Sequence, residues 1–111
     1  MTEKNDKTKN RAVELRTGDA ELEKMSAFFK AVADKTRLAI LTALLEGNLC
    51  VMHISERVGM SQSAISHQLA ILRNAKLVKT SRRGKTLVYS IADEHVRLVL
   101  DMAILHINER E

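Results

Sequence analysis

Four potential metal ligands lie close to the C-terminal end of the 111-residue sequence, in two pairs. Asp93 and His95 form the first pair, and His106 and Glu109 form the second. His106 and Glu109 are three positions apart, so a helix would place them side by side on one face. Carboxylate oxygens and imidazole nitrogens are ordinary ligands of zinc. These residue types at this spacing predict a metal site.

The distance between the two pairs decides how such a site is built. His95 and His106 are 11 positions apart, so at about 100° per residue they return to within about 20° of the same helix face. A rise of about 1.5 Å per residue separates them by about 16 Å along the axis. Zinc needs ligand distances near about 2.0–2.2 Å, so one helix cannot bring both pairs to one ion. Two antiparallel copies could join Asp93 and His95 of one chain to the other pair, giving two equivalent sites per dimer.

Each ligand also has a simpler explanation. Asp93 could cap a helix, Glu109 could be a solvated helix end, and the histidines could be polar interface residues. Together, two nitrogens and two carboxylates favour a tetrahedral Zn²⁺ or Co²⁺ site, and Ni²⁺ would need further ligands. A metalloenzyme is the rival interpretation, but a closed four-ligand site leaves no position for water or substrate. We therefore expect no enzyme and no small-molecule substrate.

The segment that carries these ligands, from Asp93 to the end, is apolar around most of its circumference. Its apolar residues are Val96, Leu98, Val99, Leu100, Met102, Ala103, Ile104, Leu105 and Ile107. A helix that is apolar nearly all round must be buried nearly all round. A domain of this size covers only one side of a terminal helix, so we expect the other side to meet a second copy across a two-fold axis.

Cys50 and His53 form a weaker metal-binding pair on a predicted short helix. Residues 1–18, the N-terminal arm, contain neither Cys nor His to complete a second metal site. A buried structural thiol is therefore the simpler interpretation of Cys50. Because Cys50 is the only cysteine, the chain has no internal disulfide, which fits a reducing cytoplasm.

Residues 60–78, reading MSQSAISHQLAILRNAKLV, predict a helix that Ser61 caps. Its inward stripe consists of Ile65, Leu69 and Leu72. The opposite face carries the candidates for groove contact: Gln62, Ser63, Ser66 and His67. Small hydrogen-bonding side chains let a helix approach base edges in the major groove, although an ordinary amphipathic helix with a solvated face is the alternative.

The flanking segments favour the DNA-binding interpretation. Val51, Ile54 and Val58 mark a short preceding helix, and Gly59 supplies the bend, which together give a helix-turn-helix. Downstream, Leu77-Val78 and residues 87–91 predict two strands around SRRGK, with the turn at Gly84. The candidates for phosphate contact on this basic wing are Arg82, Arg83 and Lys85.

The charge distribution supports the same conclusion. The formal net charge is +4, and residues 61–92 contain no Asp or Glu. The basic residues in that window are Arg73, Lys76, Lys79, Arg82, Arg83 and Lys85. A patch of one sign attracts a polyanion, so we expect double-stranded DNA as a partner.

Composition and patterning set the domain organisation. Apolar residues make up 45% of the chain and aromatic residues 3%, with no Pro and four Gly, which predicts a mostly helical domain over residues 19–111. Two scaffold helices are expected before the short one, the first with the stripe Leu22, Met25, Phe28, Phe29 and Val32. The second starts near Asp34 and ends at Gly47, with Leu38, Leu41, Leu44 and Leu45 inward. Residues 1–18 are charged and are expected to be a flexible arm.

No apolar run reaches about 18 residues and the polar start is unlike a signal peptide, so we expect a soluble cytoplasmic protein without a membrane partner.

From about Met25 to the C-terminus, the chain resembles the ArsR/SmtB family of metal-sensing winged-helix repressors. The resemblance rests on FKAVADKTRLAILTALLEG, on NLCVMHISERVGMSQSAISHQLAILRNAKLVKTSRRGKTLVYSI and on the final D-x-H…H-x-x-E, which matches the zinc-sensing subgroup. It implies a homodimer that binds its operator without metal and releases it on binding metal, controlling metal efflux or sequestration genes.

One departure from the family pattern bears on the metal. Arsenic, cadmium and lead sensors of the family carry a Cys-x-Cys pair on the short helix, whereas Cys50-Val51-Met52 keeps one thiol. We therefore expect a mainly α winged helix-turn-helix of about five helices and a two-stranded wing, with Zn²⁺ as its regulatory effector. The alternative is a winged-helix regulator that responds to cobalt, to nickel or to a signal other than a metal.

Overall fold

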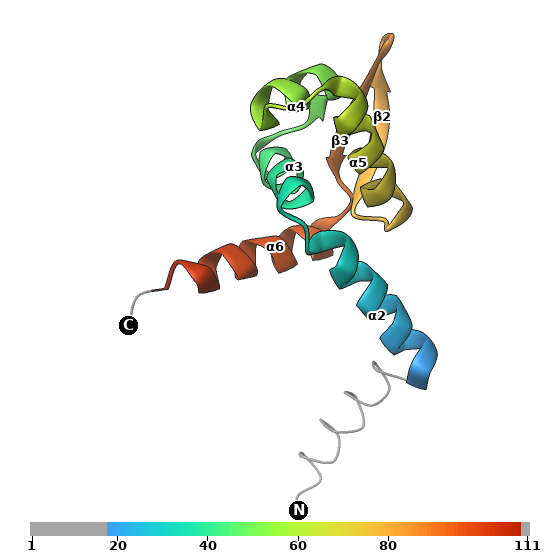
Figure 1. The fold of residues 1–111 in the computed structure, drawn as a ribbon, viewed down its shortest axis with the longest axis vertical. Helices are drawn as coiled ribbons and strands as arrows, with labels where there is room; N and C mark the ends of the chain where they lie inside the picture. The colour runs from blue at the N-terminus through green and yellow to red at the C-terminus, as the bar shows by residue number, and fades with distance from the viewer. Residues whose placement is uncertain (1–17, 110–111) are drawn as a thin grey trace, which may run out of the picture. The chain divides into compact units, whose positions relative to one another are not determined.

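The computed structural model describes residues 18–109, in which five helices and a three-stranded antiparallel sheet follow one another (Figure 1). Their order is α2 (Gly18–Val32), α3 (Lys35–Glu46), β1 (Leu49–Cys50), α4 (Val51–Val58), α5 (Gln62–Asn74), β2 (Val78–Arg83), β3 (Thr86–Ile91) and α6 (Glu94–Ile107). The chain divides after Lys30 into two units. The arm predicted for residues 1–18 lies outside the described residues, except for Gly18, which begins α2.

The first unit contributes most of α2, which has the predicted position but not the predicted burial. Leu22, Met25 and Phe29 are about half exposed, so the apolar stripe is not core in a single chain. Phe28 and Phe29 contact each other edge to face, with ring centroids 5.1 Å apart. The stripe was expected to be scaffold because periodicity identifies an apolar face but not what covers it.

In the second unit, α3 begins and ends where the sequence predicted. Asp34 caps it by accepting a hydrogen bond from the Arg37 backbone N–H at 3.0 Å, and Gly47 ends it. Leu41 and Leu44 are fully buried, as expected. Leu38 was expected to point inward and is 38% exposed; Ile40 is fully buried instead.

The helix-turn-helix is formed by α4 and α5. Gly59 ends α4 in the left-handed region at φ 81°, which a side chain would disfavour. The Ser61 hydroxyl then accepts a hydrogen bond from the Ala64 backbone N–H at 3.1 Å and so starts α5. The residues predicted to anchor α5 in the core are all fully buried: Ile65, Leu69 and Leu72. This part of the prediction is confirmed.

The sheet has the strand order β1-β3-β2, so the predicted two-stranded wing gains a third strand. Leu49 pairs with Tyr89 and Cys50 pairs with Val88. Two residues are too few to show the period-2 alternation that identifies a strand in a sequence, which is why β1 was missed. The hairpin itself is confirmed, but β2 continues through Arg83, so that Arg82 and Arg83 lie in the strand and Gly84 and Lys85 form the turn.

The last helix, α6, is only partly covered by its own chain. Asp93 caps it, and Val96 and Leu100 are buried. Its exposed apolar residues are Leu98, Val99, Met102, Ile104, Leu105 and Ile107. Figure 1 shows α6 leaving the end of β3 and projecting from α3 and the sheet. None of the helices in residues 18–109 has the length and apolar character needed to cross a membrane.

A non-glycine residue in the left-handed region ends α5. Lys76 has φ 62°; its N–H donates to the Arg73 carbonyl, and the Leu77 N–H donates to the Leu72 carbonyl at 2.9 Å. This is the Schellman arrangement, in which glycine is the usual left-handed residue. Buried Leu72 and Leu77 provide the apolar residues that usually accompany it.

Lys76→Gly should therefore raise the free energy of unfolding by about 0.5–1 kcal/mol. The left-handed conformation costs an L-residue about 1–2 kcal/mol, and this relief exceeds the roughly 0.4–1 kcal/mol that glycine adds to the entropy of the unfolded chain. Urea unfolding at one fixed protein concentration measures the change. Lys79→Gly, within β2, is the matched control and should destabilise the protein. Destabilisation by both variants would contradict the assignment of strain to Lys76.

Candidate functional site

The outer face of α5 is built as the sequence predicted. Its candidates for groove contact are all exposed: Gln62, Ser63, Ser66 and His67. The first turn of the helix contains no acidic residue. Because Ile65, Leu69 and Leu72 fix the opposite face in the core, these four side chains cannot turn inward. Their role in reading bases remains a prediction.

A residue that sequence reasoning missed holds α5 against α3. The Arg37 guanidinium donates from Nη1 to the Gln68 side-chain oxygen at 3.1 Å and from Nε to the Ala31 carbonyl at 2.6 Å. The Arg37 side chain is only 16% exposed and lies 4.0 Å from the Asp34 carboxylate. A signal was present in the sequence, because a cation in the first turn of a helix opposes the helix dipole and so needs another partner.

The hairpin places its arginines on opposite faces of the sheet. Arg82 pairs with Leu87 and shares the face that Val78 and Ile91 bury in the core. Arg83 pairs with Thr86 on the other face. There it lines a cavity of about 410 Å³ with Asn48, Leu49, Cys50, His53, Thr86 and Val88. The sequence predicts Arg82 and Arg83 as equivalent phosphate contacts, but the register separates them because successive strand residues point to opposite sides.

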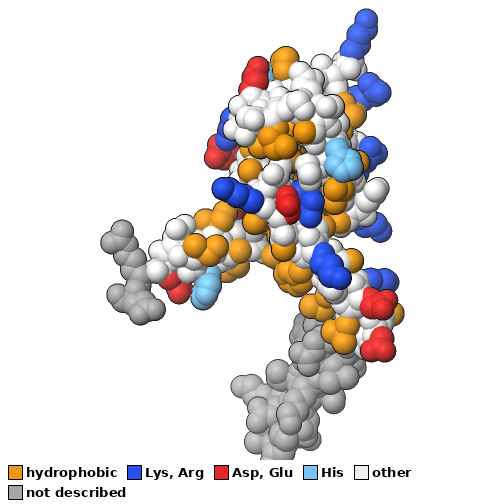
Figure 2. All heavy atoms as spheres, in the orientation of Figure 1, with side chains coloured by type: hydrophobic (Ala, Val, Ile, Leu, Met, Phe, Trp, Pro, Cys, Tyr) orange, Lys and Arg blue, Asp and Glu red, His pale blue; other side chains and the backbone are white. Residues whose placement is uncertain are grey.

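Basic side chains gather at the wing. Figure 2 shows Lys and Arg side chains at the hairpin tip and along the edge of the view where Figure 1 places β2 and α5. Lys85 is exposed in the turn, and Arg82 and Arg83 are exposed in β2. Together with the absence of acidic residues from 61 to 92, this gives the wing a single sign of charge.

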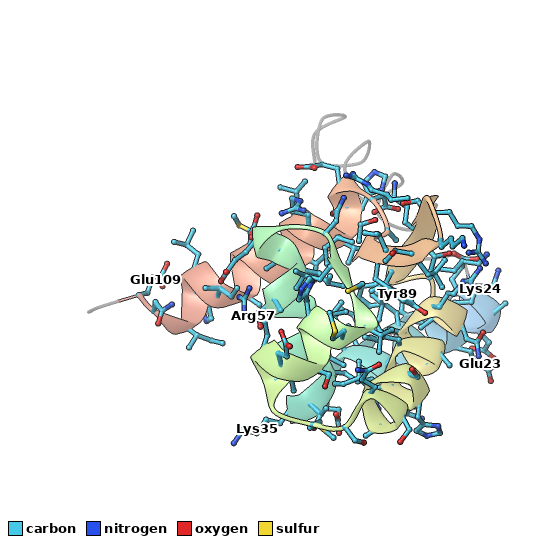
Figure 3. The ribbon with its side chains drawn as sticks, turned by 90° about the horizontal axis from the view of Figure 1, so that it is seen from above. Glu23, Lys24, Lys35, Arg57, Tyr89 and Glu109 are labelled. Carbon is cyan, nitrogen blue, oxygen red and sulfur yellow. The ribbon has the colours of Figure 1, made fainter. Side chains whose placement is uncertain are left out.

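The four predicted metal ligands form two separate pairs on α6. The Asp93 Oδ1 atom lies 3.6 Å from His95 Nδ1, and His106 Nδ1 lies 3.8 Å from Glu109 Oε1. The histidine side chains are 92% and 84% exposed, so both pairs are open to an external ligand. Figure 3 shows Glu109 at the far end of α6. Across residues 18–109, no three His, Cys, Asp or Glu side chains converge on one point, which agrees with the 16 Å estimate from the spacing.

Asp93 also has the simpler role that the sequence allowed. Its Oδ1 atom accepts a hydrogen bond from the Val96 backbone N–H at 3.0 Å. That hydrogen bond is the main reason why the pKa of Asp93 lies below its ordinary value, and His95 lowers it further. The carboxylate is therefore ionised at neutral pH, which is the form that a metal ligand needs. A nitrogen and a carboxylate at each end of α6 fit half of a zinc site, so the residues present suit this metal.

The Cys50 and His53 pair is present but incomplete. The Cys50 Sγ atom lies 3.4 Å from His53 Nδ1. Cys50 is half-buried at the start of α4, so it is less enclosed than the structural thiol that was expected. No third metal ligand approaches the pair within the described part of the chain.

Known proteins resemble this chain both in sequence and in fold. Residues 34–80 match the family described as "Bacterial regulatory protein, arsR family". The chain is 48% identical over 82 residues to the HTH-type transcriptional regulator NmtR of Mycobacterium tuberculosis, covering 74% of this chain and 68% of that protein. It is 40% identical over 91 residues to the transcriptional repressor SmtB homolog of Synechocystis, covering 82% and 69%. A homodimeric winged helix-turn-helix DNA-binding domain from Mycobacterium bovis superposes with a TM-score of 0.78 at 31% identity, covering 81% and 83%.

The opposite faces of the hairpin predict unequal effects of its two arginines on DNA binding. Arg82→Ala should weaken binding to all duplexes and reduce the salt slope by about 1, because it removes one phosphate contact. Arg83→Ala should change the affinity and the salt slope less, because Arg83 lies on the opposite face of the hairpin and lines the cavity beside Cys50 and His53. Fluorescence anisotropy over a range of salt concentrations measures both variants, on a duplex selected by the protein from a random pool and on random DNA. Ser63→Ala is the contrasting control, expected to weaken the selected duplex more than random DNA. Equal losses for Arg82→Ala and Arg83→Ala would contradict the assignment.

Proposed function

Since the chain belongs to the arsR family of bacterial regulatory proteins, we propose that it is a zinc-responsive transcriptional repressor that binds operator DNA as a homodimer and releases it when metal binds. The family and these relatives are transcriptional regulators and not enzymes. The observation that carries the metal response is the placing of two nitrogen–carboxylate pairs at opposite ends of one exposed apolar helix.

The DNA-binding part of the proposal rests on α5 and the wing. A helix capped at Ser61 presents short polar side chains away from the core, as major-groove readout requires. The basic hairpin follows directly, so that it can reach the phosphates beside the groove. The partner is double-stranded operator DNA.

The dimer rests on the uncovered face of α6. Leu98, Leu105 and Ile107 are 48%, 59% and 77% exposed, although each would gain from burial. A second antiparallel α6 is the partner that covers this face and completes the ligand set at once. The superposable Mycobacterium bovis domain is described as homodimeric, which supports this assembly.

Each proposed metal site would use Asp93 and His95 of one protomer with His106 and Glu109 of the other. Bound Zn²⁺ would supply a fixed tetrahedral junction between the two helices. Zinc is preferred over Ni²⁺ because two nitrogens and two carboxylates complete the usual coordination number of zinc, whereas Ni²⁺ would need further ligands. The genes under control would then be those of metal efflux or sequestration.

Release from DNA follows from a geometric demand. Two recognition helices must match major-groove faces about one helical turn apart, so a modest subunit rotation is enough to break the match. A metal-ligating histidine usually donates its other ring N–H to a carbonyl or a carboxylate, and the backbone carbonyl around Lys76 is the acceptor that we propose for His106. Within residues 18–109 of a single chain, His106 Nδ1 lies 3.8 Å from Glu109 Oε1 and forms no hydrogen bond with Lys76, so we propose that this bond forms when the metal binds.

A second function from the same fold is a regulator that responds to cobalt, to nickel or to a signal other than a metal. It is favoured by the exposure of both histidines, because an open site accepts further ligands and a larger coordination number. Operator binding measured across a panel of metals separates this alternative from zinc sensing.

Mixing two inactive variants tests whether the site crosses the dimer. His95→Ala and His106→Ala should each remove both sites in their own homodimers, whereas their heterodimer should regain one intact site and bind one zinc ion tightly. Competition titration against a chromophoric chelator, on a heterodimer purified through two different tags, gives the affinity and the stoichiometry. Glu94→Gln, a neighbouring exposed carboxylate outside the ligand set, is the control and should leave both sites intact. A heterodimer without a tight site would rule out the shared arrangement.

Zinc should weaken operator binding by about 5- to 150-fold, the usual range of coupling between two sites on one protein. Anisotropy titrations with zinc and with a chelator give the ratio. Because protons compete with the metal for its ligands, zinc affinity should fall as the pH is lowered. Asp93→Ser is the matched variant, since serine keeps the helix cap and removes the carboxylate ligand. It should fold, bind DNA and lose the response. Unchanged operator affinity of the wild type with zinc would show that the site is not a sensor.

A further inference from the structure

The two ends of α6 are held very differently by the rest of the chain. Its first half is anchored, because Val96 and Leu100 are 6% and 4% exposed. Every residue from Asp101 to Glu109 is exposed, and Figure 3 shows this second half projecting from the domain. Asp93 and His95 thus lie on the anchored half, whereas His106 and Glu109 lie on the projecting half. The anchored half is therefore the part of α6 that contacts the rest of its own chain.

One side chain of α6 forms a hydrogen bond with a distant part of the DNA-binding unit. The Arg97 guanidinium donates from Nη1 to the Leu45 carbonyl at 3.0 Å, across 52 positions in the sequence. Leu45 lies in the last turn of α3, where carbonyl groups have no partner within the helix and a cation is favoured by the helix dipole. Arg97 therefore caps α3 from another element, with a charge-assisted hydrogen bond.

This bond supplies an orientation that the apolar contacts of α6 do not. Burial of Val96 and Leu100 holds the helix in place, but apolar attraction has no direction and allows a helix to turn or slide. A hydrogen bond weakens steeply when its angle closes, so Arg97 fixes the rotation of α6 relative to α3. The Ala92 N–H, which donates to the Leu77 carbonyl at 3.0 Å, fixes the point at which the helix begins.

The end of α3 also contacts the first helix of the helix-turn-helix. Glu46 follows Leu45 directly, and its Oε1 atom lies 2.7 Å from Arg57 Nη2 on α4. Arg57 is labelled in Figure 3. Both partners are well exposed, so this ion pair is weak, and the apolar contact between α3 and α4 carries most of the connection. Beyond α4, the turn at Gly59 leads directly into α5.

We propose that Arg97 is the positioning residue that carries metal occupancy at Asp93 and His95 to the DNA-binding helices, through the carbonyl of Leu45. The proposal rests on the function proposed above and adds a path within one subunit. With the bond in place, α6 and α3 turn as one body, so a rotation imposed at the metal site moves α4 and α5. Without it, α6 turns on its apolar contacts while α3 stays where it is.

The experiment compares operator affinity with zinc and with a chelator for the wild type and for three variants of the full chain. Arg97→Met keeps the apolar stem and removes the donor, Arg97→Lys keeps a donor, and Glu94→Gln is a control on the same helix. Arg97→Met should reduce the zinc-dependent change in operator affinity at least about fivefold, while zinc affinity of the DNA-free protein stays within about threefold of the wild type. Arg97→Lys should restore part of the response, and Glu94→Gln all of it. By linkage, zinc should bind the DNA complex of Arg97→Met more tightly than that of the wild type.

A purely structural role would give a different result. Arg97→Met would then lower the melting temperature and weaken operator binding equally with and without zinc, which leaves the zinc-dependent ratio unchanged and overturns the proposal. If the methionine variant does not fold, Arg97→Gln takes its place, because glutamine is too short to reach the Leu45 carbonyl. A wild-type zinc-dependent ratio in the folded glutamine variant would overturn the proposal in the same way. A wild-type ratio of one would instead contradict the sensor function itself.

Discussion

A helix that is apolar on nearly every side, with the proposed metal ligands at both of its ends, is the constraint on which this molecule depends. Only Val96 and Leu100 of α6 are buried by its own chain. One metal ion cannot reach both ligand pairs, because the axial rise of the helix separates them by about 16 Å. A second antiparallel α6 would therefore both bury the remaining apolar face and complete the proposed metal site.

The DNA-binding part of the chain, in contrast, is complete by itself. Side chains of α3, α4 and α5 supply most of the fully buried core: Ile40, Leu41, Leu44, Ile54, Ile65, Leu69 and Leu72. Arg37 sets α5 against α3 through Gln68, and the Schellman turn at Lys76 directs the chain from α5 into the wing. A well-packed DNA-binding unit is thus joined to the projecting helix α6 at a few defined contacts. In such an arrangement, a change at the helix can rotate the whole unit.

Local chemistry is what made much of this predictable from the sequence. Ser61, Gly59 and the spacing of Ile65, Leu69 and Leu72 define α5 and its outer face, because caps, left-handed turns and helical period act over a few residues. The features that the sequence did not predict depend on distant partners or on the exact pairing of strands. The two-residue strand β1 has no periodicity, the opposite faces of Arg82 and Arg83 require the register of the hairpin, and Arg97 finds Leu45 across 52 positions. Leu38 matched the inward stripe and is exposed because helical spacing does not say how wide the covered face is.

The central claim is that one metal ion joins the anchored end of one α6 to the projecting end of another. The most direct test is a crystal structure of the zinc-loaded protein, with anomalous scattering recorded at the zinc edge. We expect two equivalent zinc ions per dimer, each bound by Asp93 and His95 of one protomer and by His106 and Glu109 of the other. Zinc bound at Cys50 and His53, or held by the ligands of a single protomer, would contradict it.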